Sequence, residues 1–324
     1  MMGTAQIAQS SRQQGIALIS VLLVFALATV IASEIIVRNA LDIRKTANYL
    51  NSQQAYYYAL SGEAYGQQIL HRDFMEASAQ GVAADTLSDE WALLKSGFEI
   101  ENGTMTIAIV DLSGRFNLNR LVGADGTIDA VAVSTFSSLV SALGIPRNYT
   151  PALTDWLDAD GFEVPGGAED SRYSGEGYLT ANRPLADLSE LRLLAGFDQN
   201  DYAVLKDYVV ALPVDSDNGA GTYNINTLDA KLIKALVPAI SAAELEKIDA
   251  IQRRGGFTSL ANWIGSDVGS VLETLSPRLA VSSEYFEIAV TVTFAGRSAR
   301  LTTQLYRTAK DGELRVLKRQ QLRD

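Results

Sequence analysis

The N-terminal part of the chain contains an unbroken apolar run from Ile16 to Ser33, without a charged residue. At about 1.5 Å per residue, a helix of this length spans roughly 27 Å, close to the ~30 Å hydrocarbon thickness of a bilayer. A secretory signal would end in a small-residue cleavage site, whereas here the helical pattern continues from Glu34 to Arg38. We therefore expect a transmembrane helix over residues 16–37 that stays attached to the mature chain.

A short polar leader precedes this run and ends in a glycine, reading Arg12-Gln13-Gln14-Gly15. This junction resembles the leader of type IV pilins and type II secretion pseudopilins, which a prepilin peptidase cuts after the glycine. The resemblance implies that residues 1–15 are removed by cleavage between Gly15 and Ile16 and that the product is methylated. It also implies a single-pass protein of the bacterial inner membrane with its globular part in the periplasm.

The fifth residue of the expected mature chain is Ser20, and the first is Ile16, where pilin-like proteins usually have glutamate and phenylalanine. The large minor pseudopilin K (GspK) family of the type II secretion system lacks that glutamate and carries an outsized globular domain, and this chain resembles it. The resemblance implies a subunit that caps the tip of a pseudopilus, in a complex with I-type and J-type minor pseudopilins, and serves protein export across the outer membrane. We expect no enzymatic activity.

The composition excludes or disfavours several other kinds of protein function. The chain has 324 residues, no cysteine, one histidine (His71) and a net charge of −11. The lack of cysteine excludes disulfides, Cys-ligated zinc and thiol catalysis, and the acidic balance disfavours binding to the phosphate backbone of nucleic acids. We interpret His71 as a partly exposed helical residue, although a Ser-His-Asp triad would depend on it.

Periodicity predicts the regular elements. No proline occurs before Pro146, and the apolar spacing predicts one helix from residue 16 to 72 whose second half is amphipathic. A short helix is expected at residues 91–95. Alternating apolar and polar residues then predict two β-hairpins, over residues 97–110 and 285–306, with a last strand at 313–317.

The two hairpins stand at opposite ends of a helical middle. We expect an α+β fold in which the long helix packs on a small antiparallel sheet formed by residues 73–111 and 284–324. This sheet would be interrupted by a large all-α insertion, residues 112–283. The pairing of the two hairpins across the insertion is an inference from their positions in the chain.

The expected insertion contains an internal repeat. Residues Gly114–Leu121 (GRFNLNRL) are matched by Gly221–Leu228 (GTYNINTL), with the glycine, both asparagines and the leucine identical. Each copy places an asparagine where it can cap a helix. We therefore expect two related helical halves.

The second copy opens a stretch, residues 224–265, that resembles helix-hairpin-helix (SAM-like) modules, which bind DNA phosphates through hairpin glycines. The hairpin position here, residues 237–241, has no glycine, and Pro238 removes a backbone donor. We expect this fold without nucleic-acid binding. A membrane-anchored periplasmic helix-hairpin-helix binding protein remains the alternative.

An acidic, glycine-rich loop, residues 155–173, carries six carboxylates and one arginine. Like charges at this density repel one another unless a cation lies between them, and calcium accepts six to eight oxygen ligands in flexible geometry. The spacing does not fit an EF-hand, because Glu163 occupies the position of the turn glycine. A solvated loop without metal remains open, as does a calcium-dependent periplasmic enzyme.

Resemblance to the K-type pseudopilins, whose helical domain carries calcium sites, favours calcium as a cofactor. We expect the ligands to be Asp158, Asp160, Glu169 and Asp170, with Asp155 a weaker candidate. A second acidic turn, residues 215–219, is also explained by ordinary turn chemistry.

Overall fold

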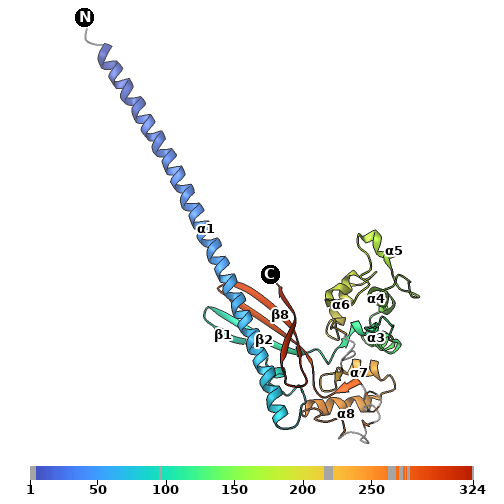
Figure 1. The fold of residues 1–324 in the computed structure, drawn as a ribbon. Coiled ribbons are helices and arrows are strands. Elements are labelled where there is room, and N and C mark those ends of the chain that lie inside the picture. The colour runs from blue at the N-terminus through green and yellow to red at the C-terminus, as the bar shows by residue number, and fades with distance from the viewer. Residues whose placement is uncertain are drawn as a thin grey trace.

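The structure is a computed structural model that describes residues 5–94, 97–214, 222–261, 268–269, 273, 275 and 278–322, with side chains from residue 16 onward. A long helix leads into a five-stranded sheet, and a helical insertion lies beyond the end of that sheet (Figure 1). The expected α+β fold is confirmed.

Helix α1 (Ala5–Ala79) is a single helix of 75 residues and extends beyond both expected ends. Its C-terminal third packs closely on the sheet. Gly62 and Gly66 make this possible, because a Cβ atom on Gly62 would lie 2.8 Å from Val290 Cγ1 and one on Gly66 would lie 2.9 Å from Ile288 Cδ1. A side chain at either position would force the facing side chains of the sheet to shift.

The sheet is antiparallel, in the order β1-β2-β7-β8-β9. Its strands are β1 (Gly97–Ile100), β2 (Gly103–Asp111), β7 (Tyr285–Phe294), β8 (Arg297–Arg307) and β9 (Leu314–Leu322). Both predicted hairpins are present, and β2 pairs with β7 along its whole length, so the inferred pairing across the insertion is confirmed. The short helix α2 (Glu90–Leu93) is a single turn, and β9 is longer than predicted.

The core of the sheet layer lies between α1 and the sheet. Alternate side chains of β7, at Phe286, Ile288, Val290 and Val292, are fully buried against the helix. Trp91 closes one end of this core, with its ring edge-on to Phe286 at 5.5 Å. Burial of each such side chain contributes about 1.5–3 kcal/mol, so this layer is a packed domain in its own right.

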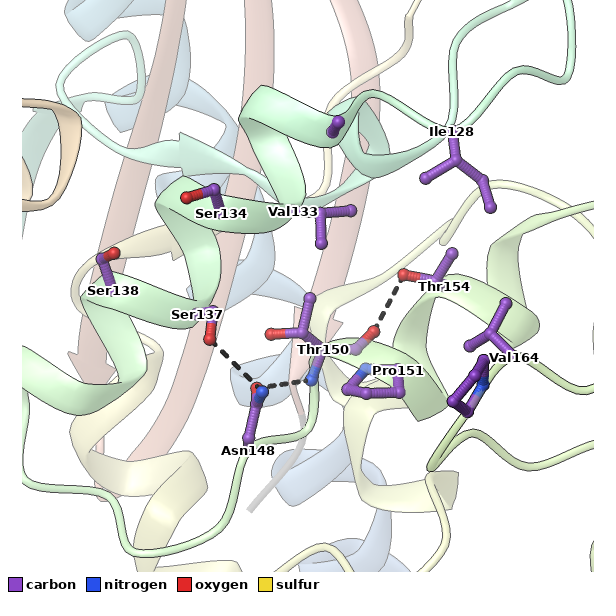
Figure 2. Close-up of a pocket in the computed structure, with 12 residues that line it drawn as sticks. Ile128, Val133, Ser134, Ser137, Ser138, Asn148, Thr150, Pro151, Thr154 and Val164 are labelled. Atoms are coloured by element: carbon purple, nitrogen blue, oxygen red, sulfur yellow. Dashed lines mark hydrogen bonds between the residues drawn. The ribbon is translucent and has the colours of Figure 1, made fainter.

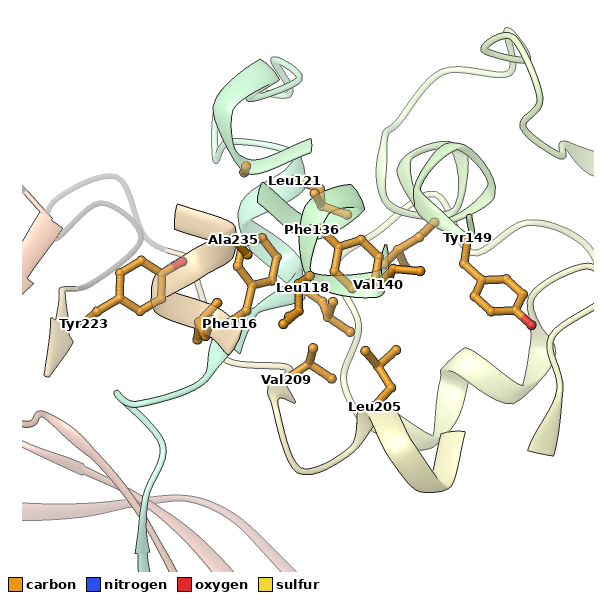
Figure 3. Packing of buried hydrophobic residues seen from close by; sticks show 14 of the residues in the cluster. Phe116, Leu118, Leu121, Phe136, Val140, Tyr149, Leu205, Val209, Tyr223 and Ala235 are labelled. Carbon is orange, nitrogen blue, oxygen red and sulfur yellow. The ribbon is translucent and has the colours of Figure 1, made fainter. Parts of the chain in front are cut away.

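The insertion between β2 and β7 has a separate core, which Figure 3 shows. It is mostly helical, but it also contains two short parallel pairs that the expected all-α insertion did not include: β3 (Phe116–Asn117) with β4 (Val209–Val210), and β5 (Tyr223–Asn224) with β6 (Leu279–Ala280). Among its described residues, the bounded α-helices are α3 (Ala130–Ala142), α4 (Thr150–Leu157), α5 (Asp170–Tyr173), α6 (Gln199–Leu205), α7 (Ala230–Leu236) and α8 (Ala242–Arg253). Its 3₁₀ helices are η1 (Leu118–Leu121), η2 (Ser174–Glu176) and η3 (Leu188–Leu193).

The sequence repeat corresponds to a structural repeat. In each half, the second asparagine of the motif binds one backbone segment through both ends of its amide: Asn119 with Leu185, and Asn226 with Phe257. In each half the motif also pairs, in parallel, with a short strand from the end of that half. The prediction of two related halves is confirmed, and they share one core in which Phe116 and Phe136 stack at 5.6 Å (Figure 3).

Candidate functional site

The expected leader junction lies inside α1, whose helical backbone continues through Gly15 and Ile16. Ser20 Oγ donates to the Ile16 carbonyl at 3.0 Å. The hydroxyl groups of Thr29 and Ser33 likewise each donate to the carbonyl four residues earlier in the helix. The Ser20 hydroxyl is therefore bound to its own helix and presents no negative charge to a neighbour.

The apolar part of α1 can span a membrane by length and composition, since an 18-residue window within Ile16–Ala79 has a mean hydropathy of 2.7 and none of it is buried in the protein. Glu34 and Arg38 form an i,i+4 ion pair at the end of this segment, at 2.5 Å. This agrees with one membrane span that ends near Arg38.

Past the apolar segment, α1 exposes a row of large apolar side chains at seven-residue spacing. Ile43, Leu50 and Tyr57 are 69%, 58% and 59% exposed. They lie on the face of the helix opposite Ala55 and Ala59, which are buried against the sheet. Apolar residues seven apart are typical of helices that pair as a left-handed supercoil, so this face suits a partner helix.

The acidic loop brings three of the five expected ligands together. One carboxylate oxygen each from Asp158, Asp160 and Glu169 lies within 4.8 Å of the other two. Asp158 immediately follows α4, and Glu169 immediately precedes α5, so the loop closes on itself between two helix ends. Asp158 and Glu169 are buried, and Asp158 Oδ1 and both Glu169 oxygens have no hydrogen-bond partner.

The other two expected ligands hold the loop backbone. Asp155 is fully buried and accepts hydrogen bonds from the backbone N–H of Val164 and Ala168, at 3.1 and 2.7 Å. Gly167 lies so close that a Cβ atom there would be 1.9 Å from Asp155 Oδ2. Asp170 accepts from the Thr180 N–H at 2.9 Å. These two side chains shape the cluster from outside it.

The electrostatics of the cluster suit a cation. Burial, together with the neighbouring carboxylates of Asp160, Asp155 and Glu169, raises the pKa of Asp158 to about 6. Burial also raises the pKa of Glu169. Asp158 and Glu169, whose buried oxygens have no partner, and the exposed Asp160 offer the hard oxygen ligands that calcium prefers, and backbone carbonyls and water can supply the remainder of its shell. The residues present therefore fit the expected metal.

The second acidic turn, residues 215–219, lies outside the described residues. A different cluster, Asp73, Asp85 and Asp89, was not anticipated. There the positive charge comes from Arg307, whose Nη2 binds Asp85 Oδ2 at 2.5 Å. The Arg307 guanidinium lies between the rings of Phe74 and Phe286, at 5.1 and 4.7 Å from their centres.

This cluster continues into a buried polar joint between the sheet and the insertion. Asp111, at the end of β2, accepts hydrogen bonds from Ser283 Oγ at 2.6 Å, Thr227 Oγ1 at 2.5 Å and Asn224 Nδ2 at 3.3 Å. Its burial raises its pKa to about 6. No sequence signal could have found this joint, because Asp111 lies more than 100 residues along the chain from each of these three partners.

In the stretch that resembles helix-hairpin-helix modules, α7 and α8 are joined through residues 237–241, the expected hairpin position. Two of the basic side chains in this region have partners within the protein. Lys234 Nζ donates to the Ile240 carbonyl at 2.7 Å, and Arg253 pairs with Asp249 at 3.0 Å. His71 Nδ1 lies 3.1 Å from the Gly312 carbonyl, where it joins the end of α1 to the turn between β8 and β9.

Comparison with known proteins gives a consistent result. Two family models, both described as Type II secretion system (T2SS), protein K, match residues 114–214 and 223–282, which correspond to the two halves of the insertion. The chain is 35% identical to type II secretion system protein K of Pseudomonas aeruginosa over 322 residues, covering 95% of this chain and 92% of that protein. It is 36% identical to that of Klebsiella pneumoniae over 291 residues, covering 85% and 86%.

The fold also matches a solved structure. The crystal structure of the GspK-GspI-GspJ complex from the enterotoxigenic Escherichia coli type 2 secretion system contains a chain that superposes with a TM-score of 0.70 at 25% identity. The match covers 87% of this chain and 100% of that one.

Proposed function

Because this chain belongs to the type II secretion system protein K family and is thus a minor pseudopilin, we propose that it caps the tip of a pseudopilus and helps to drive protein export across the outer membrane. The observation that carries this proposal is Ser20, which occupies the place of the usual glutamate and whose hydroxyl is bound to its own helix. In pilin-like filaments that glutamate is thought to neutralise the terminal amine of a neighbouring helix, a charge that costs at least ~2.5 kcal/mol near the bilayer centre.

A subunit without this carboxylate is tolerated where no further subunit presents an amine, which is at an end of the filament. The insertion supports the same position. It forms a second globular body beyond the sheet (Figure 1), with its own core, and such bulk would collide with the next subunit along a shaft.

The partners proposed are smaller I-type and J-type minor pseudopilins, since the solved relative is a GspK-GspI-GspJ complex. The exposed row at Ile43, Leu50 and Tyr57 provides a face for their stem helices. Leu50→Glu should therefore abolish co-purification of both subunits from membranes. Asn48→Glu places the same charge on the other side of α1 and should leave the complex intact.

The position in the filament has a direct test. An epitope tag in the insertion, labelled with gold, should mark one end of each pseudopilus. Regular labelling along the shaft would refute the cap. A complex that forms normally with Leu50→Glu would refute the proposed contact face but not the position at the tip.

We also propose that prepilin peptidase removes residues 1–15, leaving a single-pass inner-membrane protein with a periplasmic globular part. Intact-mass analysis of the membrane-bound chain should show a terminus at Ile16, and Gly15→Leu should leave the leader in place. A mature chain that begins after Ser33 would show that the apolar segment was an ordinary signal.

Calcium is the proposed cofactor of the acidic loop, with Asp158, Asp160 and Glu169 as ligands from side chains. The support is the set of buried carboxylate oxygens that have no partner. Bound calcium supplies positive charge between them and ties the end of α4 to the start of α5. We propose a structural role, because the loop connects two parts of one core.

A further inference from the structure

Three carboxylates face one another where the end of α1 meets the loop between α1 and α2. One oxygen each from Asp73, Asp85 and Asp89 lies within 4.8 Å of the other two. The groove between α3 and α4 on the insertion, by contrast, is lined by uncharged side chains (Figure 2). Three like charges at such short distances repel one another unless hydrogen-bond donors or a proton compensate them.

The loop between α1 and α2 binds the insertion. The Asp85 carbonyl accepts hydrogen bonds from Asn224 Nδ2 at 3.0 Å and from Asn226 Nδ2 at 3.1 Å. The Asp85 carboxylate accepts from the Ser283 N–H at 2.7 Å. Asp73, on α1, therefore faces the loop through which the stem contacts the insertion.

Two of the three carboxylates have hydrogen-bond donors. Asp85 Oδ2 accepts from Arg307 Nη2 at 2.5 Å. Asp89 accepts from the Thr86 N–H at 2.6 Å, from Thr86 Oγ1 at 2.9 Å and from Trp91 Nε1 at 3.3 Å. These donors stabilise the ionised form of both side chains.

Asp73 has no such donor among the described residues. Arg307 does not serve it, because the guanidinium lies between the rings of Phe74 and Phe286 and its Nε and Nη1 have no hydrogen-bond partner. The cluster thus lacks one donor, which a proton on Asp73 would supply.

The remaining charged groups near the cluster leave this balance unchanged. Arg72 is paired with Glu90 of α2, and Glu76 adds a further negative charge on α1. The other titratable groups around the cluster are His71 on α1, Asp111 at the end of β2, and Lys310 and Asp311 in the turn between β8 and β9 that packs on Phe74.

The folded protein holds a proton on Asp73 more tightly than the unfolded chain does. Burial, together with the neighbouring carboxylates of Asp89 and Asp85, raises the pKa of Asp73 to about 7, against 3.8 for the ordinary group. The pKa in the folded state is the higher one, so the stability due to this carboxyl is present at low pH and is lost as the pH rises through 7.

We propose that protonated Asp73 donates a hydrogen bond to the carboxylate of Asp85 or Asp89, and that this bond fastens the end of α1 to the loop that binds the insertion. Loss of the proton to water leaves three negative charges facing one another, so the loop separates from α1 more often. The attachment of the insertion to the stem is thus sensitive to pH. The proposal does not depend on the position of the subunit in a filament or on calcium in the acidic loop.

The test is hydrogen exchange of the full chain in lipid nanodiscs, measured by mass spectrometry on peptides that cover residues 82–92. After correction for the intrinsic exchange rate, the equilibrium constant for opening of this loop should rise about tenfold from pH 6 to pH 8. Asp73→Asn keeps a neutral donor at every pH, so its opening should stay constant within about twofold. Histidines titrate near neutral pH, and His71→Gln is therefore the matched control, which should retain the tenfold rise.

The unchanged chain tests the proposal without any variant, since a flat profile from pH 6 to pH 8 would overturn it. An equal rise in Asp73→Asn would also overturn it, because another group would then be titrating. The measurement is made in calcium and again in chelator, and we expect the same profile in both. A rise that occurs only in chelator would assign the cluster to a metal ion in place of the proton.

Discussion

Arg319, on β9, and Glu63, on α1, form a two-point ion pair: Nε lies 2.8 Å from Oε2, and Nη2 lies 2.6 Å from Oε1. Glu63 is 3% exposed and also accepts from Thr303 and Gln67. The Arg319 side chain is 42% exposed. The pair joins the last strand of the sheet to the stem helix, so the C-terminal end of the chain is fastened to its N-terminal element.

This difference in burial predicts an asymmetry between the two single variants. Arg319→Met leaves the Glu63 charge buried without its partner and should lower the free energy of unfolding by about 3 kcal/mol. Glu63→Gln leaves Arg319 free to turn to water and should lower it by only about 1 kcal/mol. Urea titrations followed by tryptophan fluorescence measure both. The exposed pair Arg315–Glu313 supplies the control, since Glu313→Gln should cost less than about 1 kcal/mol; equal losses in all three variants would contradict the interpretation.

Calcium should raise the melting temperature of the chain, because the proposed site exists in the folded loop and not in the unfolded chain. At 100 times its Kd, a ligand adds about 2.7 kcal/mol. Asp158→Asn should remove most of this effect. Glu163→Gln makes the same change of charge in the same loop but outside the carboxylate cluster, and it should retain the effect. Identical melting curves in calcium and in chelator would leave a solvated loop as the better explanation.

Asp111 should make the fold less stable as the pH rises. Its pKa is about 6 in the folded protein, mainly because of burial, against 3.8 for the ordinary group. The folded state therefore holds the proton more tightly, and the stability due to this carboxyl is complete below pH 4 and is lost as the pH passes 6. The loss amounts to about 3 kcal/mol. The difference in unfolding free energy between the unchanged chain and Asp111→Asn, measured from pH 4 to 7, should follow this curve; parallel pH profiles would show that Asp111 titrates normally.

The two repeat asparagines should be equally important to the insertion. Asn119→Ala and Asn226→Ala each remove at least three buried hydrogen bonds to backbone groups. Each should cost about 3 kcal/mol, because the backbone groups are left without partners. Asn200, an exposed residue on α6, provides the matched control, and Asn200→Ala should change the stability by less than 0.5 kcal/mol, about the scale of surface substitutions. A strong effect at only one of the two repeat positions would mean that the halves do not share this design.

Local patterns in the sequence predicted the local parts of the fold. The spacing of apolar residues located α1, and Asn102-Gly103 located the first hairpin, because helices and tight hairpins are specified by residues close in the chain. The repeat at Asn117 and Asn224 indicated the two halves, because each copy of the motif is a short continuous segment that can be recognised by itself. What it could not indicate was the short parallel pairing within each half, since the partner strands β4 and β6 lie 55 or more residues away.

The candidate metal site was predicted in part. Carboxylate density located the loop, and Asp158, Asp160 and Glu169 do converge. The sequence could not separate these from Asp170, which accepts from the Thr180 N–H, because a carboxylate that binds a backbone N–H group has the same pattern as one that faces a cation. The pairing of Asp85 with Arg307 could not be predicted from local patterns either, since the two residues are 222 positions apart in the sequence.

The stem helix also sets a fixed geometry between its apolar segment and the globular part. Between Arg38, at the end of the apolar segment, and Ala55, where α1 is first fully buried, the helix is continuous. Every residue in this stretch adds about 1.5 Å of height and about 100° of rotation. Removing one residue would therefore turn the sheet and the insertion to a different side of the stem, whereas removing seven would lower them by roughly 10 Å and change their direction by only about 20°. The number of residues in this stretch therefore sets both the height of the globular part above the apolar segment and the direction in which the insertion points.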